Sequence, residues 1–162
     1  MAEDEQRSAD TADDTRRIYA GIHERQIVDG TSKRLPGYVE LLDLDVSGLR
    51  CLDLGAGSTS RDAIRLLTAG AAHVVLVDVG HDWIATARGE LEHAGFASDQ
   101  YSFVEVSNWL AAAEQSEYDF VTCNGVLHHM EDPDGVMAVV SASLRRGAHL
   151  YLMVIGKGGI VR

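Results

Sequence analysis

The residues with the clearest chemical potential are two carboxylates that flank a glycine turn. Asp53 ends an apolar run and leads into Gly55 and Gly57, and Asp78 ends a second apolar run 21 residues after Gly57. Because glycine has no Cβ, such a turn lets main-chain NH groups come close to a ligand. In doubly wound folds an acidic residue about 20 residues after the turn accepts hydrogen bonds from ribose hydroxyl groups. The spacing therefore predicts a site for a nucleoside-containing cofactor, with Asp78 on the ribose.

The charge of Asp53 separates two classes of cofactor. A nicotinamide-binding turn has the pattern G-x-G-x-x-G, and Ser60 stands where the third glycine is needed for close packing of helix on strand. A carboxylate at Asp53 would also lie near a pyrophosphate of the same sign of charge. It is better matched to a cationic cofactor, such as one with the ammonium and sulfonium groups of S-adenosylmethionine (SAM). The simpler alternative is that Asp53 only caps the helix that follows.

The turn resembles the first motif of the class I SAM-dependent methyltransferases. After its first strand, that family has an acidic residue followed by three glycines at alternate positions. Asp53, Gly55 and Gly57 match this pattern, whereas Thr59 stands in place of the last glycine. The chain thus keeps the first two glycines of the motif and departs from it at the third.

Two later stretches extend the resemblance. Residues 117–133 are similar to the fourth strand and following loop in the small-molecule branch of the family, which is the more specific match. Residues 144–152 are similar to the family's helix end, glycine turn and fifth strand. The resemblance covers residues 48–156. It implies SAM as cofactor, S-adenosylhomocysteine (SAH) as product, and a small-molecule acceptor that attacks the methyl carbon in line with the leaving sulfur.

On this resemblance, the cofactor site is expected to use the following residues: Asp53, Gly55, Ala56, Gly57, Asp78, Val79, Asn108, Trp109, Asn124, Gly125 and Tyr19. Asn124 and Gly125 are expected near the sulfonium. Asn108 could replace, by hydrogen bonding, an acidic residue that the family has near the adenine amino group, and a plain loop asparagine is the alternative. Tyr19 is the candidate for a lid contact, and simple packing of its ring on the sheet is the alternative.

His128 and His129 are the candidate catalytic residues. They follow the predicted fourth strand, at the edge of the sheet where open α/β folds bind ligands. One of them could act as a general base, because histidine titrates near neutral pH. The alternative is that they shape the pocket or hydrogen-bond the backbone. A base is needed mainly for a hydroxyl or carbon acid, so the methylated atom (O, N or C) stays open.

Strands and helices alternate along the chain, which predicts a doubly wound, mostly parallel α/β sheet of the Rossmann-like kind. The strands are expected at residues 49–54, 73–78, 101–106, 118–123 and 148–155. Members of the resembled family continue after the fifth strand with a helix and two more strands, so the sheet is expected to lack the last two strands of the family. We expect a missing C-terminal segment or an oligomer partner to cover the open edge of the fifth strand.

Two of the predicted helices have recognisable ends. One is expected to begin with Asp82 as its N-cap and to end at Gly95. Another is expected to begin with Asp132 as its N-cap and Pro133 in its first turn. The buried stripe and terminal glycine of this second helix are expected at Val136, Val140, Leu144 and Gly147.

The chain divides into four expected segments. Residues 1–14 form an acidic disordered tail, residues 15–47 a helical lid, residues 48–156 the SAM-binding core, and residues 157–162 an end where the chain may be truncated. Six acidic residues and one arginine in the tail account for −5 of the formal net charge of −11, which leaves −6 on the rest. This balance repels phosphate backbones and predicts that nucleic acid is not the partner.

No signal peptide or membrane-spanning run is recognisable in the sequence, and the two cysteines have no zinc-type spacing. These observations predict a cytoplasmic protein that neither enters a membrane nor holds a metal. Besides a methyltransferase, two other functions are considered: a SAM-binding module without turnover, acting as a scaffold or regulator, and a nicotinamide-dependent oxidoreductase. Ser60 and Asp53 oppose the second of these.

Overall fold

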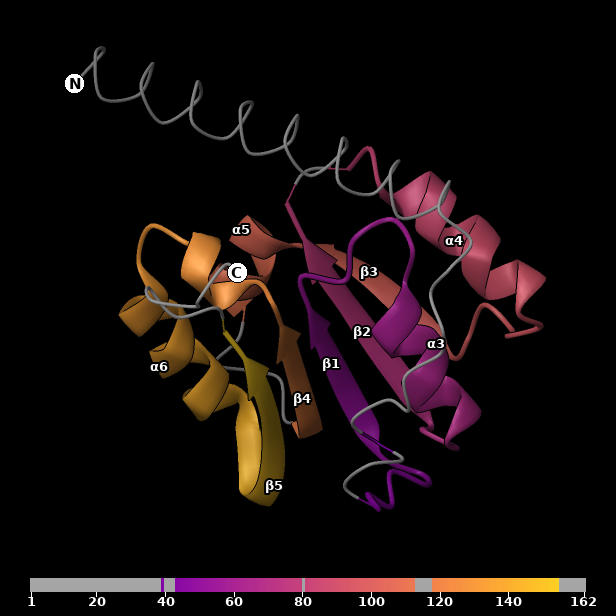
Figure 1. The fold of residues 1–162 in the computed structure, drawn as a ribbon, viewed down its shortest axis with the longest axis horizontal. Coiled ribbons are helices and arrows are strands. Elements are labelled where there is room, and N and C mark those ends of the chain that lie inside the picture. Colours follow the sequence, from indigo (N-terminus) through magenta and orange to yellow (C-terminus); the bar gives the residue numbers. More distant parts are fainter. Residues whose placement is uncertain (1–38, 40–42, 80, 113–117, 155–162) are drawn as a thin grey trace, which may run out of the picture. The chain divides into compact units, whose positions relative to one another are not determined.

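Five parallel strands form the sheet of the computed structural model, which describes residues 39, 43–79, 81–112 and 118–154 (Figure 1). The strands are β1 (Arg50–Leu54), β2 (His73–Asp78), β3 (Tyr101–Glu105), β4 (Tyr118–Asn124) and β5 (Leu144–Met153). Their spatial order is β3-β2-β1-β4-β5, so β1 is paired with both β2 and β4. The strand order reverses between β1 and β4, and ligands of open α/β sheets bind at the carboxyl ends of the strands at such a reversal.

Helices cover both faces of this sheet. The helices are α3 (Arg61–Thr68), α4 (Ile84–His93), α5 (Val106–Ala112) and α6 (Pro133–Ser143), with the short 3-10 helix η2 (Leu127–His129) before α6. Side chains of α3 and α4 share one apolar cluster with Cys51, Val74 and Leu76, while side chains of α5 and α6 share another with Leu52 and Val75. Because successive strand residues point to opposite faces, the two clusters lie on opposite sides of the sheet. The predicted doubly wound, Rossmann-like fold is confirmed.

The first four predicted strands agree with the structure to within one residue at each end, but the fifth prediction was wrong at its start. β5 begins at Leu144, directly after α6, and not at residue 148. Leu144 therefore pairs with Tyr118 of β4 and does not continue the helical stripe. The register then shifts, since His149 is the next partner and faces Phe120. Gly147, with a positive φ of 85°, lies in this irregular stretch and does not end the helix.

Of the two predicted caps, one is confirmed and one was wrong. Asp132 is the N-cap of α6, where its side chain accepts a hydrogen bond from the NH of Gly135 at 2.9 Å, and Pro133 occupies the first turn. Asp82 does not cap α4, because the residue before that helix is Trp83 and no side-chain cap is formed. The Trp83 ring is buried and packs edge-on against Phe103. Aromatic packing at this position therefore sets where α4 begins.

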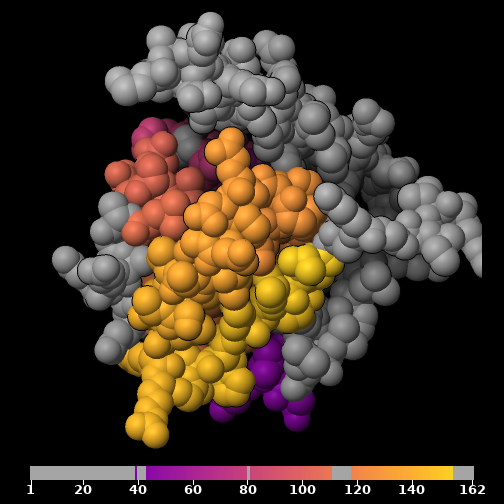
Figure 2. Space-filling model, turned by 90° about the vertical axis from the view of Figure 1, so that its left-hand side faces the viewer, coloured from indigo at the N-terminus to yellow at the C-terminus, as the bar shows by residue number. Residues whose placement is uncertain are grey.

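The sheet edges in the described part of the chain are β3 and β5. Figure 2 looks at the β5 side, where α6 and β5 form the surface in orange and yellow. Leu152 and Met153 near the end of β5 are among the exposed large apolar side chains. No helix within the described ranges has the length and apolar character needed to cross a membrane. The predicted tail, most of the predicted lid and the last eight residues lie outside the described residues.

Candidate functional site

The glycine turn is held over the end of β2 by main-chain hydrogen bonds. Gly55 and Gly57 have positive φ angles of 82° and 60°, which glycine adopts without a steric penalty. The NH groups of Gly55 and Ala56 both donate to the carbonyl oxygen of Val77, at 2.7 and 3.2 Å. The turn after β1 thus crosses to the neighbouring strand, at the sheet edge where a ligand is expected.

Asp78 ties the same turn to the end of β2 through its side chain. Its Oδ2 accepts a hydrogen bond from the NH of Gly57 at 2.7 Å, and its Oδ1 accepts one from the NH of Val79 at 2.7 Å. The carboxylate is only half-buried. Since each carboxylate oxygen can accept two hydrogen bonds, Asp78 keeps capacity for a ribose hydroxyl while it shapes the turn.

Gly55 is closely packed against the loop that follows β4. A Cβ built at this position would collide with the side chain of Val126. The absence of a side chain at Gly55 therefore lets the loop after β4 sit against the turn, in addition to allowing the positive φ. The sequence predicted this glycine for ligand approach or for the turn alone, and it did not predict the contact with Val126.

Asp53 lies beneath the turn and is almost completely buried, with 2% of its surface exposed. Its Oδ2 accepts a hydrogen bond from the NH of Ala63 in the first turn of α3, at 3.1 Å. Burial raises the pKa of the Asp53 carboxyl well above its ordinary value, and the nearby charges of Asp62 and Asp78 raise it further. Asp53 thus makes the helix contact of the simpler alternative, and its raised pKa disfavours the charged form of the carboxyl.

Asp62 was missed by sequence reasoning, although it joins two parts of the site. One of its oxygens accepts a hydrogen bond from Nδ2 of Asn124 at 2.9 Å, and the other pairs with Arg65 at 2.6 Å. The spacing of Asp62 and Arg65 on one helix is visible in the sequence, because residues three apart share a helix face. The bond to Asn124 spans 62 residues and could not be found from spacing.

The predicted pair Asn124 and Gly125 lies where β4 ends. The Asn124 side chain is directed to Asp62, as described above, and the NH of Gly125 donates to the carbonyl oxygen of Met153 at 2.9 Å. Gly125 has a positive φ of 75°, and a Cβ there would lie 3.2 Å from Cε of Met153. Both residues thus anchor the start of the loop that carries the two histidines.

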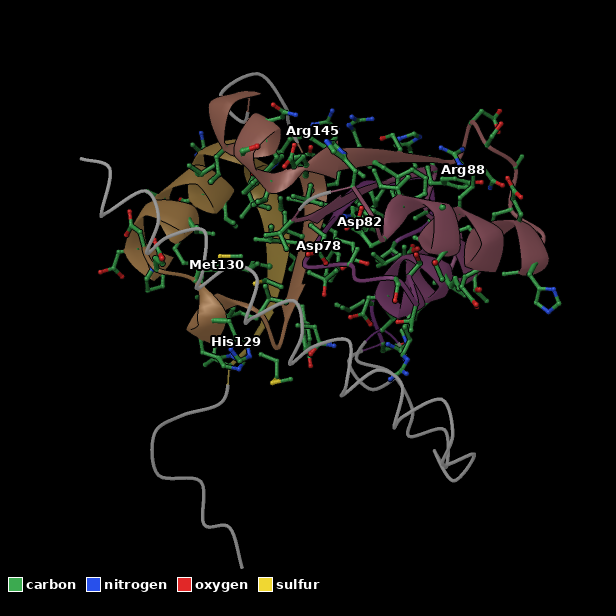
Figure 3. The ribbon with its side chains drawn as sticks, turned by 90° about the horizontal axis from the view of Figure 1, so that it is seen from above. Asp78, Asp82, Arg88, His129, Met130 and Arg145 are labelled. Atoms are coloured by element: carbon green, nitrogen blue, oxygen red, sulfur yellow. The ribbon has the colours of Figure 1, made fainter. Side chains whose placement is uncertain are left out.

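His128 and His129 are the last two residues of η2, and their ring centroids lie 3.9 Å apart. The His129 side chain is exposed, and the pKa of its ring is lowered, first by desolvation and then by His128. A lowered pKa keeps an imidazole neutral at pH 7, which is the form that accepts a proton. Figure 3 looks down on the carboxyl edge, with Asp78 near the middle and His129 and Met130 on the β4 side.

The remaining predicted site residues are dispersed. Asn108 and Trp109 lie in α5, where Asn108 is exposed and Trp109 is buried in the apolar cluster of α5 and α6. Val79 is 51% exposed beside Asp78, and Ala56 is buried in the turn. Tyr19 lies outside the described residues. Within the described ranges, His, Cys, Asp and Glu form no group of three or more that could hold a metal ion.

Charge and geometry together define what this edge of the sheet can bind. Three carboxylates, Asp53, Asp62 and Asp78, surround a turn with two glycines, and Arg65 is paired with one of them. An arrangement with this excess of negative charge favours a cationic ligand and opposes a pyrophosphate. The residues present therefore fit a nucleoside that carries ammonium and sulfonium groups.

Residues 45–156 match the family model described as Methyltransferase domain. An O-methyltransferase of ubiquinone biosynthesis from Hahella chejuensis is 32% identical over 110 residues, which is 68% of this chain and 44% of that protein. An uncharacterised protein of Synechococcus sp. is 32% identical over 111 residues, or 68% of this chain and 26% of that protein. The chain thus spans less than half the length of these two curated relatives.

The fold is shared with solved structures of low sequence identity. A SAM-dependent methyltransferase from Geobacter sulfurreducens, solved in complex with S-adenosyl-L-homocysteine, superposes with a TM-score of 0.53 at 22% identity. The match covers 67% of this chain and 42% of that protein. One from Mesorhizobium loti gives a TM-score of 0.54 at 21% identity, over 69% and 48% of the two chains.

Proposed function

This chain belongs to the methyltransferase domain family, and we propose on that premise that it binds SAM and takes part in methyl transfer to a small-molecule acceptor. The observation that carries the proposal is the glycine turn hydrogen-bonded to Asp78 at the strand-order reversal, amid three carboxylates. Asp78 would hold the ribose, and the excess negative charge would favour the cationic end of the cofactor. The curated relatives are more than twice as long as the matched part, so the proposal concerns this domain's share of the activity.

SAM, when bound, supplies a methyl group on a sulfonium that a nucleophile can displace, which leaves SAH as the product. The part left to the chain is alignment and, for some acceptors, removal of a proton. Well-oriented reacting groups correspond to effective molarities on the order of 10⁵ to 10⁸ M, so positioning can contribute much of the rate. The turn and Asp78 would orient the donor, and the loop after β4 would face the acceptor.

We propose an acceptor that is methylated on a hydroxyl oxygen. The relative from Hahella chejuensis is named an O-methyltransferase, and a hydroxyl is the kind of acceptor that gains most from a base. His129 suits this role, because its lowered pKa favours the neutral ring that takes up the proton. A cytoplasmic setting and the exclusion of nucleic acid belong to the same proposal, and the formal net charge of −11 supports the second of these.

Calorimetry with SAM and SAH tests the cofactor assignment. We expect Asp78→Ala to weaken both ligands by a similar factor of about 10 to 100, because a hydrogen bond to a charged acceptor contributes about 1.5 to 3 kcal/mol and both ligands have the same ribose. Asp82→Ala is the matched control, since it removes an exposed carboxylate four residues further along. Equal affinities for wild type and Asp78→Ala, with both chains folded, would contradict the assignment of Asp78 to the ribose.

The two other functions can be tested on the same samples. A nicotinamide-dependent oxidoreductase predicts that NAD raises the melting temperature more than SAM does, which is the opposite of our expectation. A SAM-binding module without turnover predicts tight SAH binding but no SAH formed from SAM with any hydroxyl acceptor. Formation of SAH that depends on an added phenol or alcohol distinguishes an enzyme from such a module.

A further inference from the structure

Two segments that are distant in the sequence are joined at one carboxylate. Asp62 lies in the first turn of α3, directly after the glycine turn, and Asn124 is the last residue of β4. Nδ2 of Asn124 donates to Oδ2 of Asp62 at 2.9 Å. Arg65, one turn along α3, pairs with the other oxygen at 2.6 Å, and the Asp62 side chain is only 14% exposed. Each oxygen of the Asp62 carboxylate thus accepts a hydrogen bond from a different side chain.

A second contact joins the same two segments. The side chain of Val126 occupies the space above Gly55 that a Cβ would need. Asn124 ends β4, and Val126 lies between β4 and η2, which carries the histidine pair. The loop that carries His128 and His129 is therefore seated on the glycine turn by one polar and one apolar contact.

The negative charge of Asp62 is unfavourable for the nearby buried carboxyl of Asp53. This charge is one of the causes that raise the pKa of that carboxyl. A neutral residue there would lessen the repulsion of the Asp53 carboxylate, whereas the charge of Asp62 itself is paired with Arg65. Charge placed at a cost in stability is common where function requires it. The hydrogen bond from Asn124 is the specific interaction that a carboxylate at Asp62 makes with the loop after β4.

We propose that Asp62 is a positioning residue: by holding Asn124, it fixes the loop of residues 124–129 against the glycine turn and so sets the distance between acceptor and methyl donor. The inference rests on the proposed function. It assigns Asp62 no contact with either ligand. Its effect is transmitted through Asn124 to the loop that ends in the histidine pair.

Four variants separate this role from general stability. Asp62→Ala and Asn124→Ala remove the bond between α3 and β4. Asp62→Asn keeps an oxygen that can accept from Asn124 and loses the charge, while Arg65→Met loses the ion pair and keeps the bond. The last two are therefore the matched controls. Hydrogen–deuterium exchange of residues 125–130 reports on the loop, because the NH groups of His129 and Met130 are bonded within it.

We expect exchange of residues 125–130 to accelerate about tenfold in Asp62→Ala and Asn124→Ala, since a hydrogen bond to a charged group contributes about 1.5 to 3 kcal/mol. Arg65→Met should exchange like wild type in this segment, and Asp62→Asn should fall between wild type and Asp62→Ala, because a neutral hydrogen bond contributes about 0.5 to 1.5 kcal/mol. The affinity for SAH, measured by calorimetry, should stay within about threefold of wild type in Arg65→Met, whose side chain is not among the expected cofactor residues. A residue that only stabilised the whole domain would instead accelerate exchange in every strand.

The outcomes are distinguishable. Faster exchange spread evenly over all strands, together with a lower melting temperature in all four variants, overturns the inference. So does unchanged exchange in Asp62→Ala while SAH still binds. Absence of SAH binding by the wild-type chain overturns the proposed function instead, whatever the exchange rates show.

Discussion

The two halves of the candidate site are built differently. The turn between β1 and α3 is held by main-chain NH groups, two of which donate to Val77 and one to Asp78. The loop after β4 is held to the rest of the site by side chains, chiefly Asn124 on Asp62 and Val126 over Gly55. The donor half therefore depends on backbone conformation and the acceptor half on which side chains are present. Proteins that share a fold can keep the backbone conformation of the donor half while the side chains of the acceptor half differ with the acceptor.

We expect the largest effect at Gly55, where the glycine turn contacts the loop after β4. Gly55→Ala would place a Cβ against Val126 at a φ of 82°, so we expect a loss of about 2 to 4 kcal/mol in the free energy of unfolding. Urea denaturation measures it. Gly89→Ala in α4 is the control, because no atom lies within 4 Å of its added Cβ, and it should gain about 0.5 to 1 kcal/mol.

A second substitution divides the two contributions at Gly55. Val126→Ala in the Gly55→Ala background removes the two methyl groups nearest the added Cβ but leaves the Cβ of residue 126 at 2.9 Å and the strained φ, so it should recover part of the lost stability. Full recovery would mean that the backbone conformation costs nothing, and no recovery would mean that the loop after β4 does not press on the turn. Either result would contradict the view that both the positive φ and the contact with Val126 require a glycine at this position.

The next effect is expected at Asp53, beneath the donor half. Its pKa in the folded protein lies well above its ordinary value of 3.8. As the pH rises above that value, the carboxyl loses its proton at a lower pH in the unfolded chain than in the folded chain. The free energy of unfolding therefore falls progressively with rising pH. Asp53→Asn should therefore be more stable than wild type at pH 7, because the amide carries no charge that burial would penalise.

The gain from Asp53→Asn should shrink as the pH falls from 8 to 5, because the protonation that the folded carboxyl needs costs less as the pH approaches 3.8, the ordinary pKa of the unfolded carboxyl. Melting temperatures of both chains across this range provide the measurement. A gap that widens toward acid would show that the hydrogen bond to Ala63 outweighs the cost of the buried charge. Tighter SAM binding by the variant would argue against an electrostatic role for this carboxylate.

The smallest effect is expected in the acceptor half, at the histidine pair. His128 is one of two causes that lower the pKa of His129, so His128→Gln should move that pKa upward, toward 6.5. NMR titration of the His129 ring measures it directly. In wild type the folded ring protonates less readily than the unfolded one, so stability should decline slightly as pH falls below 6.5. Because the ring is exposed, this decline should stay below about 0.5 kcal/mol.

Local patterns predicted the donor half well. The apolar runs of β1 and β2 and the two glycines between carboxylates are contiguous features, so their burial and turn geometry follow from neighbouring residues. The Asp132 cap was likewise predicted, because a cap needs only an acceptor three residues before an NH. Predictions failed where a distant partner decided the outcome. Trp83 took the place of Asp82 at the start of α4 because its ring packs on Phe103 of β3.

The sequence by itself determined the doubly wound fold, the turn and the charge that favours a cationic nucleoside, because hydrophobic periodicity, glycine conformation and net charge are properties of short segments. Tertiary structure alone decided that β5 begins at Leu144, that Val126 closes over Gly55, and that Asp62 holds Asn124. Each of these depends on residues that lie far apart in the chain and meet only when β4 pairs with β1 on one side and with β5 on the other. Contacts of that kind are chosen by packing and by the need of buried polar groups for partners, and neither leaves a periodic trace in the sequence.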